Sequence, residues 1–224
     1  MEPHEFWQEI YPPGSFAPGP VDAGTFAVDL PDGRQLALPI RPLPDGQQAL
    51  ASLIINQASF AVQAALAESL AERLAPYEPE IVVGLPTLGL TLASAVAQCL
   101  GHSRYVPCGT SRKFWYDEQL SIPMSSVTTS AERRLYLDPR VLPLLQGRRV
   151  VLIDDVISTG TSITAGIALL AACGVEPVVI GAAMLQSDRW RERESEVLAD
   201  WQGRVVSVFE TPILSRHGDG WRAV

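Results

Sequence analysis

Apolar residues gather in short runs along this chain, and most of these runs are rich in Val and Ile. The runs lie near residues 81–84, 104–108, 149–154, 177–184 and 204–209. Apolar runs of this length are typical of strands that are buried on both faces. Stretches rich in Ala and Leu separate several of them. This alternation predicts an α/β fold, a doubly wound and mostly parallel sheet with helices on both faces.

The amino-terminal third follows other patterns. Residues 1–24 combine aromatic side chains with several prolines, which predicts an irregular arm that packs on the domain or on a neighbouring subunit. Apolar and polar residues then alternate over 25–30 and 35–40, around the Pro-Asp-Gly-Arg sequence of residues 31–34, and this predicts a β-hairpin. Over residues 47–74, apolar side chains at helical spacing predict one long helix or two.

Composition and charge narrow the classes of function. The chain has 224 residues, 47% of them hydrophobic and 19% charged, which suits one globular domain with a large core. The net charge of −8 argues against a broad nucleic-acid-binding face. The three cysteines have no metal-like spacing, so we expect thiols in a reducing compartment. No apolar run reaches the roughly 18 residues of a membrane span, and we expect a cytoplasmic protein without a membrane partner.

One stretch joins a strand, two acids and a loop of small residues. Residues 150–153 have the pattern of a buried strand, and Asp154 and Asp155 follow at its carboxyl end, where open α/β sheets bind ligands. Residues 158–162 are Ser, Thr and Gly, and they lead into a helix expected over about 163–173. The start of a helix offers backbone N–H groups and a positive dipole to an anion. The pattern predicts one ligand, with hydroxyls at the acids and a phosphate at the loop.

This stretch resembles the ribose-phosphate signature of the type I phosphoribosyltransferases, in which two acids and three variable residues precede Thr-Gly-x-Thr/Ser. These enzymes transfer 5-phosphoribosyl from 5-phosphoribosyl-1-pyrophosphate (PRPP) to a nucleobase and release pyrophosphate. The resemblance implies that Asp154 and Asp155 hold the ribose hydroxyls. It also implies that the 5′-phosphate is bound by Ser158, Thr159, Gly160, Thr161 and Ser162.

A second strand–turn–helix pattern covers residues 80–93, in the order that opens an α/β unit. In the family the corresponding loop holds the pyrophosphate of PRPP, so the resemblance assigns that role to Leu85, Pro86 and Thr87. Many relatives carry a charged residue here, whereas this loop has none. Pyrophosphate would then be held by backbone amides, by Thr87 and by charges from elsewhere.

Arg112 and Lys113 follow the next predicted strand, and Lys113 is the one lysine among 17 basic residues. The single lysine reflects either drift in the coding sequence or a position that needs a compact ammonium group. The family commonly places an Arg-Lys pair here against the pyrophosphate. The resemblance therefore assigns both residues to pyrophosphate binding, with Lys113 neutralising charge on the leaving group.

A long connection, residues 111–137, separates this strand from the acidic motif, and long connections are usually functional lids or disordered. In the family it is a flexible loop that closes over PRPP and excludes water. Residues 122–124 and 134–137 are expected to pair as a two-stranded flap. Four side chains have two interpretations each, as an acid/base or base-stacking group, or as ordinary solvated and packed residues: Trp115, Tyr116, Asp117 and Glu118.

The resemblance divides the chain into a hood, residues 1–45, and a phosphoribosyltransferase core, residues 46–224. Toward the carboxyl end, residues 186–199 predict a helix with a solvated, mixed-charge face, and residues 215–224 show no clear pattern. Relatives often contact the base with the segment that here spans about 185–190. The residues of that segment, with or without Glu210, do not identify a particular base.

Chain order and spacing are most similar to the adenine and xanthine phosphoribosyltransferases, with orotate phosphoribosyltransferase next. The resemblance implies transfer to a nucleobase, a purine, in nucleotide salvage, by a homodimer. It implies Mg²⁺ bound with PRPP, contacted by Asp154 or Asp155 through water if at all. The alternatives are an orotate or other pyrimidine phosphoribosyltransferase, and a PRPP-sensing regulatory protein without catalysis. A dinucleotide-binding enzyme is disfavoured because no Gly-x-Gly-x-x-Gly turn follows a strand.

Overall fold

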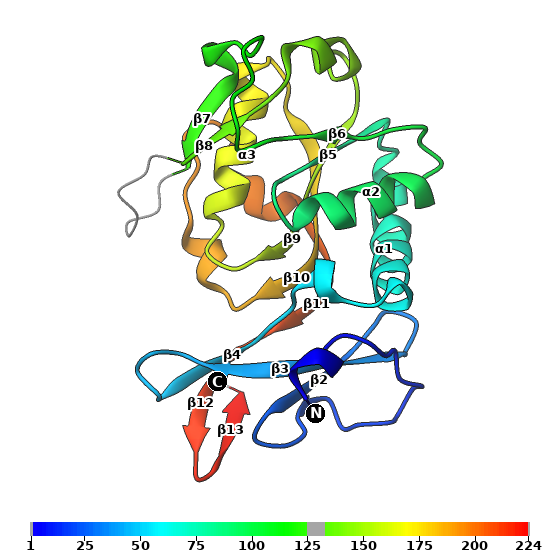
Figure 1. Ribbon diagram of the computed structural model, residues 1–224, viewed down its shortest axis with the longest axis vertical. Coiled ribbons are helices and arrows are strands. Elements are labelled where there is room, and N and C mark those ends of the chain that lie inside the picture. Colours follow the sequence, from blue (N-terminus) through cyan, green and yellow to red (C-terminus); the bar gives the residue numbers. More distant parts are fainter. Residues whose placement is uncertain (1, 125–132, 224) are drawn as a thin grey trace.

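The computed structural model describes residues 2–124 and 133–223. Its main sheet is parallel throughout and has the strand order β11-β10-β9-β5-β6 (Figure 1). The α/β class predicted from the apolar runs is thereby confirmed. The five strands are β5 (Ile81–Gly84), β6 (Val106–Pro107), β9 (Val150–Ile157), β10 (Pro177–Gln186) and β11 (Val205–Thr211).

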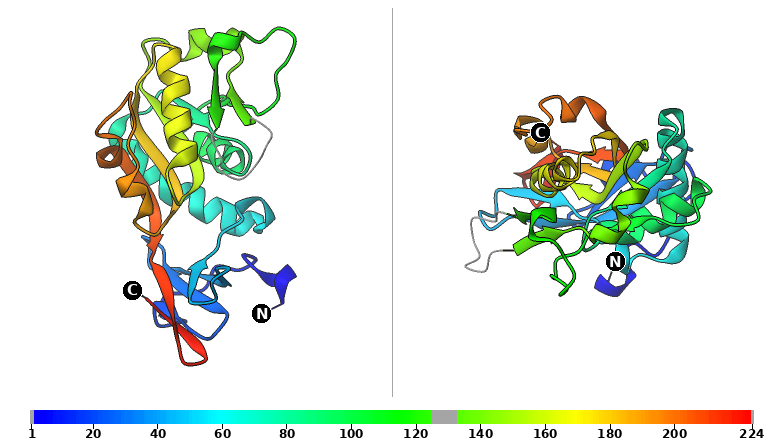
Figure 2. Two further views of the ribbon diagram at one scale, coloured as in Figure 1. Left: turned by 90° about the vertical axis from the view of Figure 1, so that its left-hand side faces the viewer. Right: turned by 90° about the horizontal axis from the view of Figure 1, so that it is seen from above.

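Helices cover both faces of this sheet (Figure 2). The helices α1 (Phe60–Leu74) and α2 (Gly89–Cys99) bury their apolar residues in one core with the inner strands. The helix α3 (Thr161–Ala172) buries Ile163, Ile167 and Leu170 in a second core on the other face. The predicted doubly wound arrangement is therefore present.

The direction of winding reverses between β5 and β9. From β5 the chain passes through α2 to the edge strand β6, whereas from β9 it passes through α3 to β10 and onward to β11. In open α/β sheets the connections diverge at such a switch point and leave a crevice at the carboxyl ends of the two strands. The loops that follow β5 and β9 border this crevice.

A smaller antiparallel sheet lies against the carboxyl ends of β10 and β11, and both chain termini lie near it (Figure 1). Its β2–β3 pair is the predicted hairpin, with Val28 opposite Leu36. The sheet combines strands from both sides of the predicted division after residue 45. In sheet order its strands are β1 (Gly19–Pro20), β2 (Thr25–Asp29), β3 (Gln35–Pro42), β4 (Gln48–Ala51), β12 (Ile213–His217) and β13 (Gly220–Ala223).

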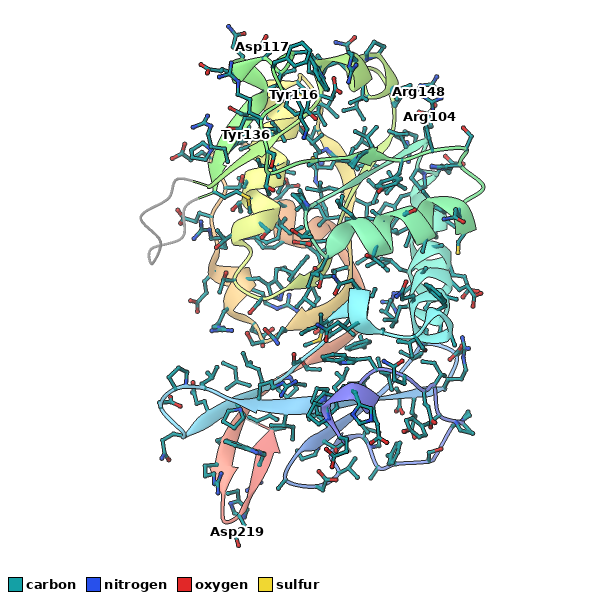
Figure 3. The ribbon with its side chains drawn as sticks, viewed as in Figure 1. Arg104, Tyr116, Asp117, Tyr136, Arg148 and Asp219 are labelled. Atoms are coloured by element: carbon teal, nitrogen blue, oxygen red, sulfur yellow. The ribbon has the colours of Figure 1, made fainter. Side chains whose placement is uncertain are left out.

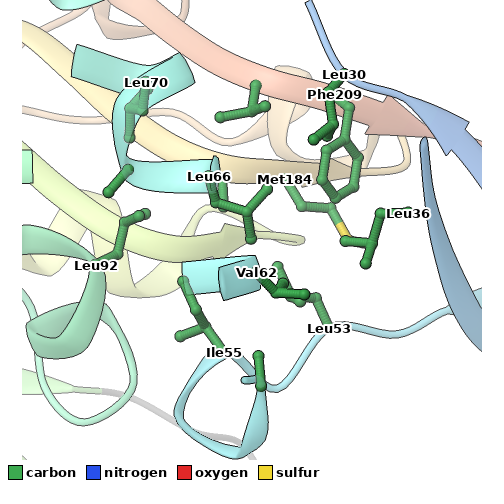
Figure 4. Close-up of a cluster of buried hydrophobic side chains, with 14 of the residues drawn as sticks. Leu30, Leu36, Leu53, Ile55, Val62, Leu66, Leu70, Leu92, Met184 and Phe209 are labelled. Carbon is green, nitrogen blue, oxygen red and sulfur yellow. The ribbon is translucent and has the colours of Figure 1, made fainter. Parts of the chain in front are cut away.

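One hydrophobic core joins the two sheets (Figure 4). Leu36 of β3 and Leu30, which directly follows β2, lie in the same cluster as Met184 of β10 and Phe209 of β11. Full burial of such a side chain contributes about 1.5–3 kcal/mol, so this contact fixes the small sheet over the ends of the main strands. The amino-terminal arm joins the cluster through Trp7, whose Nε1 donates to the Ser52 carbonyl oxygen at 2.8 Å.

The structure differs from the sequence-based predictions in three segments, residues 47–74, 186–199 and 215–224. Residues 47–74 begin with strand β4, which pairs with β3 and β12, and the helix starts only after Ser59, whose Oγ accepts from the Val62 amide. Residues 186–199 continue strand β10 and then form only a short 3₁₀ turn, Arg189–Glu192. The tail forms β12 and β13. In each case long-range pairing or packing overrides the local pattern.

The strands β7 (Ser121–Met124) and β8 (Arg133–Tyr136) form a separate antiparallel pair, as expected for the flap segments. β7 packs beside α3. The connection between these strands, residues 125–132, lies outside the described residues. No helix among residues 2–124 and 133–223 is long and apolar enough to cross a membrane.

Candidate functional site

The loops after β5 and β9 meet at the switch point of the sheet. The Leu85 amide donates to the Ile153 carbonyl oxygen at 2.9 Å, which holds the end of β5 beside β9. At the start of α2, a Cβ on Gly89 would lie 2.7 Å from Asp154 Oδ1 and 2.9 Å from Asp154 Cα. Only glycine fits there, so this residue lets α2 begin directly against the acid.

Asp154 and Asp155 lie within β9, which extends past them to Ile157, and are only 6% and 8% exposed. Asp154 Oδ1 accepts a hydrogen bond from the Asp155 amide at 3.0 Å. Burial raises the pKa of Asp154 well above its usual value, and the neighbouring Asp155 carboxylate raises it further. Burial also raises the pKa of Asp155. The pair therefore favours a shared proton or a ligand that donates hydrogen bonds to it.

The loop after β9 forms a small recess at the start of α3. Gly160, with φ of 75°, precedes α3, and the first amides of a helix have no partner within the helix. The hydroxyl oxygens of Thr159 and Thr161 lie 3.1 Å apart. A cavity of about 100 Å³ is lined by Asp154 and by residues 156–163. The structure thus brings the predicted phosphate loop and the first predicted acid to one place.

The loop after β5 offers less than the sequence predicted. The Leu85 side chain is buried, packed near Gly166 of α3, and its amide is already bonded. Pro86 has no N–H, and the peptide between Pro86 and Thr87 is cis. Of the three predicted pyrophosphate residues, Thr87 alone has an exposed side chain and an amide to offer, together with the amides that open α2.

Arg112 and Lys113 lie on the exposed loop after β6. Arg112 Nη1 pairs with Glu118 Oε1 at 2.6 Å, and both residues border a separate cavity of about 270 Å³. Tyr116 and Asp117 of the same loop lie at the end of the molecule opposite the small sheet (Figure 3). Within the described part of the chain, no hydrogen bond or ion pair joins Arg112 or Lys113 to the residues that line the recess after β9.

The four ambiguous side chains of this loop have local partners. Trp115 Nε1 donates to Asp138 at 3.2 Å, and the Arg140 guanidinium lies 4.6 Å from the centre of the Trp115 ring. Asp117 accepts from the Gln119 amide at 2.9 Å. In this conformation the four side chains behave as ordinary packed or capping residues, which is the second of the two interpretations given for them above.

Sequence reasoning missed Arg189. Its Nη2 donates to Ser158 Oγ at 3.0 Å, and its Nε donates to Ser187 Oγ at 3.1 Å. The charged run around it has the pattern of a solvated helix face, and Ser158 is 31 residues away in the chain. Only the tertiary structure brings these two residues together.

A larger cavity of about 490 Å³ opens at the carboxyl ends of β10 and β11, beside the small sheet. Thr211, 3% exposed, borders it, and its hydroxyl has no partner among the described residues. Residues 185–189 contribute the segment that the resemblance linked to the base. Three of the four charged residues that line the cavity are acids: Asp188, Glu192 and Glu210, beside Arg189.

A parallel sheet with buried acids and a recess before a helix at its switch point is typical of proteins that bind phosphorylated sugars or nucleotides. A model of the phosphoribosyl transferase domain matches residues 50–210. The chain therefore belongs to the phosphoribosyltransferase family.

The relatives reported below share 30% of their residues with this chain or fewer. The chain is 26% identical over 118 residues to the adenine phosphoribosyltransferase of Rhodospirillum centenum, a match that covers 50% of this chain and 62% of that protein. It is 30% identical over 135 residues to the bifunctional protein PyrR of Streptococcus sanguinis, covering 58% and 69%. The fold is similar to that of the Giardia lamblia adenine phosphoribosyltransferase complexed with 9-deazaadenine, with a TM-score of 0.55 and 21% identity over 70% of this chain and 81% of that one.

Proposed function

We propose that this protein transfers 5-phosphoribosyl from PRPP to an uncharged nucleobase, a purine, and releases pyrophosphate. The proposal rests on the position of Asp154. This residue packs directly against Gly89, the first residue of α2, and it also lines the recess before α3. Two buried acids and the starts of two helices thus surround one crevice. That combination suits a ligand with neighbouring hydroxyls and two phosphate-bearing ends.

In this mechanism Asp154 and Asp155 accept hydrogen bonds from the ribose hydroxyls, and the loop of residues 158–162 holds the 5′-phosphate. The amides at the start of α2 contact the pyrophosphate. All of these groups orient PRPP and stabilise charge, and none forms a covalent bond with it. The acceptor nitrogen bonds to C1 of the ribose as the bond to pyrophosphate breaks, and the proton of that nitrogen passes to water or to the released pyrophosphate. Lys113 approaches the leaving group when its own loop, which was predicted to close over PRPP, covers the site.

Magnesium fits this scheme as a companion of PRPP. No group of three or more His, Cys, Asp or Glu residues among residues 2–124 and 133–223 could hold a metal ion. Magnesium keeps several waters and binds through one or two carboxylates and substrate phosphates, which suits Asp154 and Asp155. When bound with PRPP, it neutralises charge on the pyrophosphate.

The acid-lined cavity beside β10 and β11 supports an uncharged acceptor. A carboxylate-bearing base such as orotate would meet Asp188, Glu192 and Glu210 there, and like charges repel. The carboxylates and the free Thr211 hydroxyl instead suit a base with several N–H groups. We propose this acceptor class, nucleotide salvage as its context, and a cytoplasmic homodimer as the working form.

Release of pyrophosphate tests the proposal. Purified protein, PRPP and Mg²⁺ are incubated with adenine, guanine, hypoxanthine, xanthine, orotate or uracil, and pyrophosphate is measured. We expect release with one or more purines and none with orotate. The variant Asp154→Asn/Asp155→Asn should abolish it, and Asp219→Asn, at the exposed turn before β13 (Figure 3), should not.

A PRPP-sensing protein without catalysis is the second candidate. Two observations favour it: the loop after β5 has no charged side chain, and Arg112 is engaged by Glu118. Saturable PRPP binding without release on any base would support the sensor. An absence of PRPP binding would exclude both functions.

A further inference from the structure

We propose that Arg189 binds the 5′-phosphate directly, as the cation of the recess before α3. The inference rests on the proposed function, because it takes the recess of residues 158–162 as the phosphate site. It adds a residue that lies outside the motif of residues 154–162, in a segment that the resemblance linked to the base and not to the phosphate. Three features of the described residues support it.

The first feature is the pair of partners that Arg189 has. Both are neutral hydroxyl oxygens, Ser158 at 3.0 Å and Ser187 at 3.1 Å, and the described part of the chain gives it no carboxylate partner. Arg191, two residues later, pairs instead with Asp188 at 2.8 Å. Because hydroxyl groups do not neutralise its positive charge, a guanidinium bonded only to hydroxyls can still attract an anion. Its planar array of N–H donors matches the oxygens of a phosphate.

The second feature is the charge of the recess. Its lining carries one titratable side chain, Asp154, and Asp155 is adjacent in the chain. A phosphate would bring more negative charge close to two buried carboxylates, and at short range this repulsion is costly. A cation at Ser158 offsets it. Arg193 also lies beside the recess, but there its Cβ and Cγ pack near Gly160.

The third feature is the fixed backbone on both sides of Arg189. Ser187 has φ of 66°, is 6% exposed, and donates its amide to the Thr211 carbonyl oxygen at 2.7 Å. Trp190 is buried, with its ring centre 5.7 Å from that of Trp201. These anchors fix the backbone on both sides of Arg189, and the hydrogen bond to Ser158 orients its exposed side chain, so less order has to be gained when the phosphate binds.

The test is calorimetric titration with two probes, ribose 5-phosphate and inorganic pyrophosphate. We expect Arg189→Gln to weaken ribose 5-phosphate binding at least about tenfold, the lower range for a hydrogen bond to a charged group. Arg189→Lys should restore part of the loss. Arg191→Gln removes the same charge from the same turn and should leave the affinity unchanged. Pyrophosphate binding should be the same in all variants.

Several results would overturn the inference. Equal ribose 5-phosphate affinity in wild type and Arg189→Gln would remove Arg189 from the site while leaving the proposed function intact. Equal weakening of both probes would show a structural role instead. If Arg189 acts only through Ser158, then Arg189→Gln should add no loss in a Ser158→Ala background, whereas direct contact predicts a further loss. Wild-type protein that binds neither ribose 5-phosphate nor PRPP would reject the proposed function itself.

Discussion

The loop after β9 and the loop after β6 were both predicted to contact PRPP, and the structure treats them differently. In the first, Gly160 lies so close to Trp201 and Arg193 that a Cβ there would be 3.0 Å from the Trp201 ring. In the second, a Cβ on Gly109 would meet nothing within 4 Å, and Phe114 is 95% exposed. The first loop is closely packed around its glycine. The second is joined to Tyr136 through the backbone of Gly109, but most of its side chains are exposed to solvent.

This difference matches the two halves of the proposed reaction. The ribose phosphate needs a preformed recess, because affinity is lost when binding must order the site. The pyrophosphate must be enclosed and then released, and loops that open and close are drawn from regions of low local stability. The packed loop after β9 would thus determine the affinity for PRPP, and the open loop after β6 would determine the rate of turnover.

The largest expected effect is at the packed site. Replacing both acids, Asp154→Asn/Asp155→Asn, should weaken PRPP binding about 100-fold or more, since each hydrogen bond to a charged group contributes roughly 1.5–3 kcal/mol. Calorimetry with PRPP and Mg²⁺ measures this. Unchanged affinity in the double variant would place PRPP elsewhere in the molecule.

At the open loop, Lys113→Ala should lower turnover about 10- to 100-fold and leave ribose 5-phosphate affinity unchanged. The physical reason is that Lys113 would act on the leaving pyrophosphate, which ribose 5-phosphate lacks. Steady-state rates and calorimetry on one preparation separate the two effects, with Lys113→Arg as the charge-conserving control. A loss of ribose 5-phosphate affinity in Lys113→Ala would contradict the assignment.

The same comparison explains what the sequence could predict. Strand β9, its acids and the loop before α3 are contiguous, so local patterns suffice to identify them. Arg189 reaches Ser158 across 31 residues, and β4 is a strand only because β3 and β12 flank it. The position of Arg112, paired with Glu118, likewise depends on how its loop packs. Such contacts leave no periodic signal in the chain.

Glycine substitutions sharpen the contrast between packed and open regions. Gly89→Ala should destabilise the protein by about 1–3 kcal/mol, since its Cβ would meet the side chain and backbone of Asp154. It should also weaken PRPP binding by displacing that acid. The matched change Gly109→Ala should alter neither property. Chemical denaturation and calorimetry measure both, and equal stability of the two variants would refute the close packing at α2.

The smallest expected effect is a pH-dependent difference in stability. Because burial and Asp155 raise the pKa of Asp154, the folded state binds a proton more tightly than the unfolded state. Stability from this group is complete below the ordinary aspartate pKa of about 3.9 and falls as pH rises toward the raised value. Without ligand, Asp154→Asn should therefore match wild type near pH 4 and melt a few degrees higher at pH 7, where about 1 kcal/mol corresponds to roughly 2–4 °C.

The open loop supplies the control for this effect. Glu118→Gln breaks the exposed pair with Arg112, and exposed pairs contribute about 0–1 kcal/mol. Its melting temperature should stay close to that of wild type across the same pH range. A pH-dependent gain of equal size in both variants would mean that general charge repulsion in this acidic protein, and not the burial of Asp154, sets the pH dependence. A pH-dependent rise in melting temperature confined to Asp154→Asn would show that the buried Asp154 carboxylate destabilises the ligand-free protein. Hydrogen bonds from the ribose hydroxyls would then restore that stability when PRPP binds.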